Sequence, residues 1–216
     1  MKKFILTIDG PAASGKGRIA KYISKKWRFK HLDSGTLYRR LASILYKRKI
    51  NINNENEIKK IIRVITKNKS LSFRKDKKLR SEKISRISSK IAIYSLVRNF
   101  VNSEQKKFVN RENPKIRGFV IDGRDIGSVV FKKADLKLYI DVNEQIRAKR
   151  RYKQLIDSGE KSIYPKILKD IKLRDKKDKL RKNSPLIIPK GAYRINNEGD
   201  FKITIKEINI LIKKHI

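Results

Sequence analysis

The sequence predicts an α/β protein in which helices cover both faces of a parallel β-sheet. Short apolar runs that contain or border an aspartate recur along the chain, at residues 4–8, 118–122 and 136–142. Segments with the apolar spacing of helices follow the first and the last of these runs. Strands that alternate with helices are typical of a parallel sheet with helical layers, and a chain of 216 residues is long enough for one such domain with outgrowths.

The N-terminal segment has the pattern of a strand, a loop and a helix. Residues 4–8 form a short apolar run that Asp9 and Gly10 end, as in a buried strand that leads into a tight loop. We expect a helix to begin at the end of the loop. Its inner face would carry Ile19, Ala20, Ile23 and Trp27.

The second half of the chain repeats this alternation. Residues 118–122 and 136–142 read as strands, and Asn143 is placed to cap a following basic helix. Residues 193–196 read as a last short strand. Thr204 and Glu207 have the spacing of a capping box, which predicts that the final helix begins near Thr204.

A stretch of different character, residues 36–114, separates the two halves. Helical periods dominate it, as at Ile58, Ile61, Ile62 and Ile65, and only residues 70–73 look extended. We therefore expect a core formed by residues 1–35 and 115–216, interrupted by an insertion at residues 36–114.

Residues 10–17, GPAASGKG, match the pattern GxxxxGK of a phosphate-binding loop, or P-loop. In such a loop the backbone N–H groups surround the β-phosphate of a nucleotide, and the lysine, here Lys16, reaches the β and γ oxygens. The loop follows a strand and precedes a helix, whose N-terminus adds positive potential. A glycine turn with a chance lysine is the alternative, but the context predicts nucleotide binding. The expected ATP contacts in this segment are Gly10, Pro11, Ala12, Ala13, Ser14, Gly15, Lys16, Gly17 and Arg18.

Gly17 stands where many P-loops have a Ser or Thr whose hydroxyl binds Mg²⁺. We expect Mg²⁺ to be held mainly by phosphates, water and an acidic residue instead. Asp122, at the end of an apolar strand, is placed to be that carboxylate and would act indirectly. An Asp-Gly turn without a metal role is the other interpretation of this position.

Two further signatures, residues 32–40 and 122–131, place serine, arginine and aspartate at the ends of predicted strands, where open α/β sheets bind their ligands. In residues 173–185, Arg174, Asp178 and Arg181 follow one another at steps of four and three, so they share one helix face. In a chain this basic, any single arginine is more easily read as surface charge. Their combination in short signatures favours a functional site.

The charge and composition exclude several other classes. With 58 Lys and Arg against 21 Asp and Glu, the net charge is +37, but the basic residues are spread over nearly every segment. This favours solvated surface and weak binding to polyanions over a specific nucleic-acid site. The chain has no cysteine and only two histidines, His31 and His215, which argues against zinc and thiol chemistry.

No segment looks like a membrane span, because Lys or Arg recurs every few residues. The apolar run near the start is interrupted by Asp9 and Gly10 before it reaches the length that a signal peptide needs. We expect no membrane association and a cytoplasmic location.

Six segments occur in an order that resembles the bacterial cytidylate kinase family, a branch of the nucleoside monophosphate kinases. They are TIDGPAASGKG, HLDSGTLYR, SSKIAIYSLVR, DGRDIGSVVF, RAKRRYKQL and RDKKDKLR. The resemblance covers nearly the whole chain, and it implies a P-loop NTPase core, a monophosphate-binding domain within residues 36–114 and a mobile lid near residues 147–164. It also implies a monomer.

The resemblance implies roles for individual residues. Cytosine contacts would fall on Ser34, Arg98 and Asp125, which offer the acceptor and donor groups that the base needs. Sugar contacts would fall on Ser89, Arg174 and Asp178, and contacts to the acceptor phosphate on Arg39, Arg124 and Arg181. The expected catalytic residues are Lys16, Arg124, Arg174 and Arg181. A lid arginine, Arg147, Arg150 or Arg151, would move in over ATP, and Arg150 and Arg151 are the expected ATP contacts.

The implied reaction is transfer of the γ-phosphoryl group of ATP, with Mg²⁺, to CMP or dCMP. In the family, a Gly at position 17 is common, whereas the position of Arg18 is usually a small hydroxyl residue and that of Asn196 is often acidic. Arg18 would either bind the α-phosphate or weaken ATP binding. The alternatives are a kinase for another monophosphate, such as UMP or AMP, and a basic RNA-binding protein with a degenerate P-loop.

Overall fold

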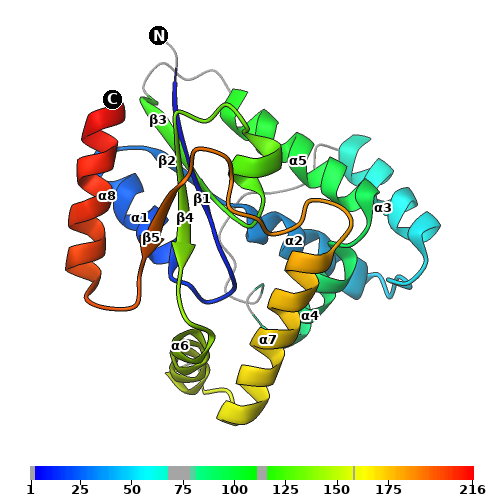
Figure 1. The fold of residues 1–216 in the computed structure, drawn as a ribbon. Coiled ribbons are helices and arrows are strands. Elements are labelled where there is room, and N and C mark those ends of the chain that lie inside the picture. The colour runs from blue at the N-terminus through cyan, green and yellow to red at the C-terminus, as the bar shows by residue number, and fades with distance from the viewer. Residues whose placement is uncertain (1–2, 68–78, 80, 111–115, 158) are drawn as a thin grey trace. The chain divides into compact units, whose positions relative to one another are not determined.

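The computed structural model describes residues 3–67, 79, 81–110, 116–157 and 159–216 (Figure 1). The chain forms two compact units. The first unit combines Met1–Leu32 with Asn113–Ile216, and the second is Asp33–Glu112.

A five-stranded sheet organises the first unit, in the order β2-β3-β1-β4-β5. Its strands are β1 (Phe4–Asp9), β2 (Lys30–Asp33), β3 (Gly118–Asp122), β4 (Leu136–Asp141) and β5 (Tyr193–Asn196). β1 pairs in parallel with β3 and β4, and β4 pairs in parallel with β5. Because Ile8 of β1 lies opposite Asp122, the P-loop and the segment after β3 leave the sheet at the same edge. This is the edge at which parallel sheets bind ligands.

The core of the first unit lies between the sheet and the helices α1 (Lys16–Trp27) and α8 (Phe201–His215), which cover the same face (Figure 1). Leu6 and Ile8, two residues apart on β1, both point into this layer and are fully buried. As expected, Ile19, Ala20 and Ile23 are buried too. Trp27 packs at the edge of the core, and its indole N–H donates to Asn209 Oδ1 at 3.0 Å.

Two more helices follow β4 in the first unit. α6 (Glu144–Asp157) and α7 (Tyr164–Leu180) bury Ala148, Leu155, Ile167 and Ile171 against each other. The predicted cap of α6 is confirmed, because the backbone N–H of Gln145 donates to Asn143 Oδ1 at 2.8 Å. A π-helical turn, η2 (Ile126–Val130), lies between β3 and β4.

The second unit contains α2 (Ser34–Lys47), α3 (Glu55–Lys67), α4 (Glu82–Ile91) and α5 (Ser95–Asn110). The Asp33 side chain caps α2 by accepting from the backbone N–H of Thr36 at 3.2 Å. The predicted helical period is confirmed in α3, where Ile58, Ile61 and Ile65 are buried and Ile62 is half-buried. The expected extended segment at residues 70–73 lies outside the described residues.

The prediction for the start of α8 is wrong by three residues. The helix begins at Phe201, and Asp200 caps it by accepting from the backbone N–H of Lys202 at 2.9 Å. Thr204 is therefore buried in the first turn, and its hydroxyl donates to backbone oxygens. Asp200 is as good a cap as Thr204, and it directly follows the turn after β5. Among the described residues, no helix is long and apolar enough to cross a membrane.

Candidate active site

Two positions of the P-loop, one beside β4 and one beside the segment after β5, leave no room for a side chain. A Cβ atom on Gly10 would lie 2.4 Å from the carbonyl oxygen of Ile140, and one on Gly15 would lie 2.4 Å from Nδ2 of Asn197. Both glycines have positive φ angles, 145° and 90°, which side chains of L-residues rarely adopt. The local backbone therefore depends on the GxxxxGK pattern itself.

Lys16 folds back over this loop. Its Nζ donates to the carbonyl oxygen of Pro11 at 2.6 Å and to Ser14 Oγ at 3.2 Å, and only 6% of the residue is exposed. Burial lowers the pKa of Lys16 well below its usual range. The charge of Arg124 adds to this effect, while Asp122 and Asp9 oppose it. The lysine is thus buried, and charged side chains of both signs act on it.

Two buried side chains that the sequence analysis did not assign to the loop hold it from outside. Nδ2 of Asn197, just after β5, donates to the carbonyl oxygen of Ser14 at 2.8 Å. Nη1 of Arg147, on α6, donates to the carbonyl oxygen of Ala12 at 3.1 Å. Arg147 also pairs with Asp175 of α7 at 2.5 Å, so this arginine ties the loop to both helices. Arg147 is buried, whereas Arg150 and Arg151 are half-buried.

Asp122 lies at the end of β3, as predicted, and its carboxylate has two different neighbours. Oδ1 is 2.6 Å from Nε2 of His31 on the adjacent strand β2. Oδ2 would be 3.9 Å from a Cβ atom on Gly17. Because Gly17 has no side chain, the carboxylate faces the P-loop directly. His31 was noticed in the sequence only as one of two imidazoles, since its partner is 91 residues away.

The described residues contain no group of three or more His, Asp or Glu side chains that would hold a metal ion. Asp122 beside the P-loop nevertheless fits Mg²⁺ that arrives on a nucleotide. Phosphates and water would supply most of the ligands, and Asp122 would supply the nearby negative charge.

Asp9 connects the P-loop strand to the segment after β3. Its two carboxylate oxygens accept from the backbone N–H groups of Ile126 and Gly127, at 2.8 and 2.7 Å, and the side chain is fully buried. Burial raises the pKa of Asp9 to about 6, although the two N–H groups act in the opposite direction. Asp9 thereby fixes the start of η2, immediately after Arg124 and Asp125. In the sequence, Asp9 is recognisable only as the residue that ends the first apolar run.

Four of the predicted acceptor-site residues gather around a fifth, Asp178. Nε of Arg124 donates to Asp178 Oδ2 at 3.1 Å, and Nη1 of Arg181 donates to Asp178 Oδ1 at 3.3 Å. Nη2 of Arg181 also lies 3.9 Å from Asp125 Oδ1. Burial acts to raise the pKa of Asp178, but the charges of Arg124, Arg174 and Arg181 outweigh it, so the pKa is lowered. We call these five residues the arginine cluster: Arg124, Asp125, Arg174, Asp178 and Arg181.

The arginine cluster reaches the P-loop electrostatically. The backbone N–H of Gly123 donates to the carbonyl oxygen of Ile8 at 2.9 Å, so Arg124 follows directly on a contact with the strand that leads into the P-loop. The charges of Arg124 and Arg174 both act to lower the pKa of Lys16. α7 ends at Leu180, so Arg174 and Asp178 share the predicted helix face while Arg181 caps the helix in an extended conformation. Several cations in one partly dry site favour a ligand that carries more than one negative charge.

The other predicted acceptor-site residues belong to the second unit. Ser34 is buried at the start of α2, and Nη2 of Arg39 donates to Asp33 Oδ2 at 2.8 Å. Ser89 is half-buried on α4. Arg98 of α5 is buried, donates to the carbonyl oxygen of Ala92 at 3.1 Å and lies over the ring of Tyr38, one turn after Ser34.

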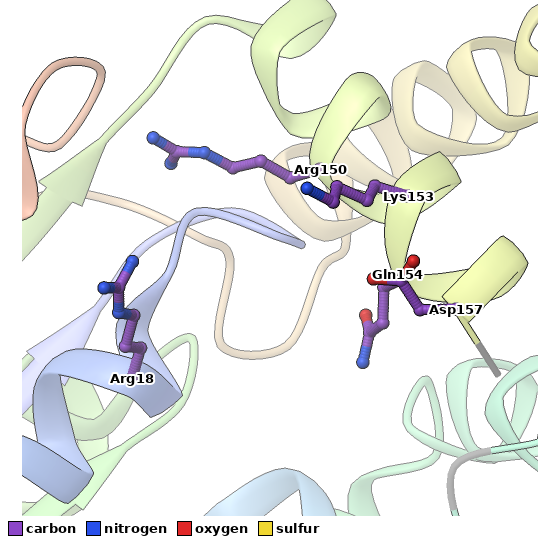
Figure 2. Close-up of a pocket in the computed structure, with 5 residues that line it drawn as sticks. All are labelled: Arg18, Arg150, Lys153, Gln154 and Asp157. Atoms are coloured by element: carbon purple, nitrogen blue, oxygen red, sulfur yellow. The ribbon is translucent and has the colours of Figure 1, made fainter.

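Arg18 and Arg150 line an open pocket of about 610 Å³ beside the P-loop (Figure 2). The other lining residues are Lys153, Gln154 and Asp157, all on α6. The guanidinium carbon of Arg18 lies 3.8 Å from the centre of the Phe201 ring. Arg151, which also lies on α6, donates to Gln154 Oε1 at 3.0 Å. Asn196 Oδ1 accepts from the backbone N–H of Glu198 at 2.8 Å and so shapes the turn after β5.

The family model described as "Cytidylate kinase" matches residues 6–215. The chain belongs to the cytidylate kinase family. This confirms the resemblance that the sequence motifs carry, and it identifies the chain as an ATP-dependent nucleoside monophosphate kinase.

Curated relatives extend over the full chain. The cytidylate kinase of Bartonella quintana is 38% identical over 223 residues, which covers 100% of this chain and 99% of the relative. The cytidylate kinase of Rickettsia akari is 39% identical, over 100% of this chain and 94% of the relative.

Solved structures with much lower sequence identity share the fold. TT1252 from Thermus thermophilus superposes with a TM-score of 0.52 at 13% identity, over 100% of both chains. An uncharacterised protein from Eubacterium ventriosum gives a TM-score of 0.54 at 14% identity, over 98% of this chain and 99% of that chain. The predicted α/β fold with a parallel sheet and flanking helices is therefore confirmed.

Proposed function

We propose that this member of the cytidylate kinase family transfers the γ-phosphoryl group of ATP to CMP or dCMP, and so gives ADP and CDP or dCDP. The observation that carries the proposal is the arginine cluster beside Lys16. Phosphoryl transfer between two nucleotides brings two anions together, and their repulsion is the main obstacle. A site with several fixed cations offsets that repulsion before the reaction begins.

Each cation has a distinct task in this mechanism. Lys16 leaves the carbonyl oxygen of Pro11 and Ser14 and binds the β and γ oxygens of ATP. Arg124 and Arg181 bind the acceptor phosphate, and Arg174 stabilises the transferred group with Lys16. Asp178 holds Arg124 and Arg181 in place until the substrate arrives. No general base is needed, because the attacking phosphate oxygen is already negative.

We propose that polar side chains recognise the acceptor nucleoside. Asp125 and Ser34 supply acceptors for the N4 amine of cytosine, and Arg98 supplies donors for N3 and O2. Ser89 and Asp178 bind the sugar. Arg39 binds the acceptor phosphate together with Arg124 and Arg181. We propose that the second unit, Asp33–Glu112, is the monophosphate-binding insertion.

Mg²⁺ that is bound to ATP would neutralise part of the charge on the phosphates. Asp122 would hold it through water, since Gly17 offers no hydroxyl.

We further propose that residues 147–164 act as a lid. Arg150 and Arg151 are the lid arginines for ATP, because Arg147 is already held by the P-loop and Asp175. We expect a cytoplasmic monomer, and the absence of cysteine fits a reducing compartment.

The proposal is tested by initial rates with ATP, Mg²⁺ and a panel of CMP, dCMP, UMP, AMP and GMP. The expected result is a clear preference for CMP or dCMP, with turnover lost in Lys16→Ala. A preference for a purine monophosphate would overturn the cytosine assignment. No turnover with any of the five, together with tight RNA binding that Lys16→Ala leaves unchanged, would overturn the kinase assignment. Light scattering checks the monomer, which has a mass of 25.3 kDa.

A further inference from the structure

Arg18 is the P-loop residue whose role the proposed mechanism leaves open. It is exposed at the start of α1, and its guanidinium carbon lies over the ring of Phe201, 3.8 Å from the ring centre. Such a cation–π contact covers one face of the guanidinium and leaves its in-plane N–H donors available. Arg18 lines the pocket in Figure 2, so these donors lie beside an open space.

Phe201 is itself held in place by its neighbours in the core. The Tyr22 ring meets it edge to face, with 6.2 Å between ring centres and 89° between planes. The hydroxyl of Tyr22 accepts from Asn209 Nδ2 at 3.2 Å. Phe201 also packs against the core that α1 and α8 share. Arg18 thus contacts an aromatic side chain that the core holds in place.

Arg150 lines the same pocket from α6, and its position relates it to the P-loop. Its Nη2 donates to the carbonyl oxygens of Asn197 and Glu198, at 2.7 and 3.3 Å. Its Nη1 lies 4.0 Å from the position of a Cβ atom on Gly15. The guanidinium therefore stands between the loop and the pocket.

The two arginines repel each other when no anion is present. Burial lowers the pKa of Arg150, and the positive charge of Arg18 lowers it further, while Glu198 acts in the opposite direction. An anion held between two like charges removes such repulsion and gains charge-assisted hydrogen bonds from both. The site is thus complementary to a phosphate group.

The position of the pocket shows which phosphate of the donor it suits. The β- and γ-phosphates belong to the loop N–H groups and to Lys16. The rest of the nucleotide has to leave the loop, and the pocket of about 610 Å³ beside Gly15 has the size of a nucleoside site. The phosphate next to the ribose, the α-phosphate, would then lie beside the two arginines.

We propose that Arg18, supported by Phe201, forms a two-arginine clamp with Arg150 on the α-phosphate of the donor nucleotide, and so replaces a hydroxyl contact in the P-loop by an ionic one. The inference rests on the proposed function only in that ATP is the donor. Arg18 and Arg150 are binding residues in this clamp. Phe201 is a positioning residue that acts through Arg18.

The test is calorimetric binding of ATP, ADP and GTP, with no acceptor present. Arg18→Ala is expected to weaken all three by about tenfold, because every one of them carries an α-phosphate and loses the same charge-assisted contact. Lys21→Ala is the matched control, since Lys21 is an exposed cation one turn further along α1. It is expected to bind all three nucleotides as the unchanged protein does.

Two further variants separate a clamp from a structural effect. Phe201→Leu keeps a bulky apolar side chain but removes the aromatic face, and it is expected to weaken binding less than Arg18→Ala. The double variant combines Arg18→Ala with Arg150→Ala. Its loss of affinity is expected to be smaller than the product of the two single-variant losses, because the arginines share one phosphate.

Unchanged or tighter ATP binding by Arg18→Ala would overturn the clamp. A loss for ATP and ADP without a loss for GTP would also overturn it, because that result assigns Arg18 to the adenine base. A loss for ATP without a loss for ADP would do the same, because it assigns Arg18 to the γ-phosphate. None of these measurements involves a monophosphate acceptor, so a failed cytosine assignment would leave their result intact.

Discussion

The Nε2 atom of His31 lies 2.6 Å from Oδ1 of Asp122, across the neighbouring strands β2 and β3. One oxygen of the carboxylate is therefore fixed by a neighbour in the sheet, and the other faces Gly17 at the start of α1. A carboxylate that is held in this way cannot rotate freely. The free oxygen of Asp122 therefore faces the P-loop, where we propose that ATP and Mg²⁺ bind.

Replacement of His31 should consequently weaken the response to Mg²⁺. His31→Phe removes the contact to Asp122 and is expected to raise several-fold the Mg²⁺ concentration that half-saturates ATP binding. His31→Gln, which keeps a donor at a similar distance, should restore part of the loss. Calorimetric titration of ATP at a series of Mg²⁺ concentrations measures this directly. His215→Gln is the control imidazole, and an equal effect there would contradict the role of His31.

Gly15→Ala should abolish tight ATP binding. Gly15 has a φ angle of 90°, and an added Cβ atom would meet Nδ2 of Asn197 at 2.4 Å, so the loop has to move. Gly191→Ala is the matched control, because Gly191 has a φ angle of 73° with nothing within 4 Å of the added Cβ atom, and it lies outside the proposed lid. Both variants should cost about 1 kcal/mol of backbone strain. Only Gly15→Ala is expected to weaken ATP binding, by at least about a hundredfold, which corresponds to about 2.7 kcal/mol.

The contact between Arg147 and Asp175 should be important for stability. Both side chains are largely buried, so Arg147→Ala leaves an unpaired buried carboxylate and is expected to lower the free energy of unfolding by about 3–5 kcal/mol. Lys149→Ala removes an exposed charge from the same helix and should change it by less than about 0.5 kcal/mol. Urea unfolding compares the two. A small loss in Arg147→Ala would show that the pair is not a main link between α6 and α7.

Asp9 should make stability depend on pH in an identifiable window. Its pKa is about 6 in the folded protein, whereas an ordinary aspartate carboxyl, as in the unfolded chain, has a pKa of 3.8. The folded protein therefore binds the proton more tightly. The contribution of this group to stability therefore rises as the pH falls through 6 and becomes constant below about 4. Between pH 7.5 and pH 5 the gain is about 1.4 kcal/mol.

Asp9→Asn isolates that contribution. The variant has no titrating group at this position. When the pH is lowered, its free energy of unfolding should therefore rise less than that of the unchanged protein. At pH 7.5 the variant loses one acceptor for the N–H groups of Ile126 and Gly127, which should cost about 1–3 kcal/mol. Urea unfolding of both proteins at pH 7.5 and pH 5 gives the difference. Parallel pH profiles would contradict the raised pKa.

Much of the fold was predictable because its signals are local. The apolar runs that become β1, β3 and β4, the glycines of the P-loop and the cap at Asn143 each act within a few residues. The start of α8 was wrong because Asp200 and Thr204 are both good caps, and the local sequence does not rank them. Family membership followed from the order of whole motifs, which is also a property of the sequence.

The sequence by itself determined the phosphate loop, the strands that frame it and the family, since chain connectivity and side-chain chemistry are enough for these. Only the tertiary structure decided that Asn197 and Arg147 hold the loop, that His31 orients Asp122 and that Phe201 supports Arg18. Each of these contacts joins residues 91 or more positions apart in the chain. The sheet order and the packing of α1 against α8 bring them together, and no spacing in the sequence encodes such a distance.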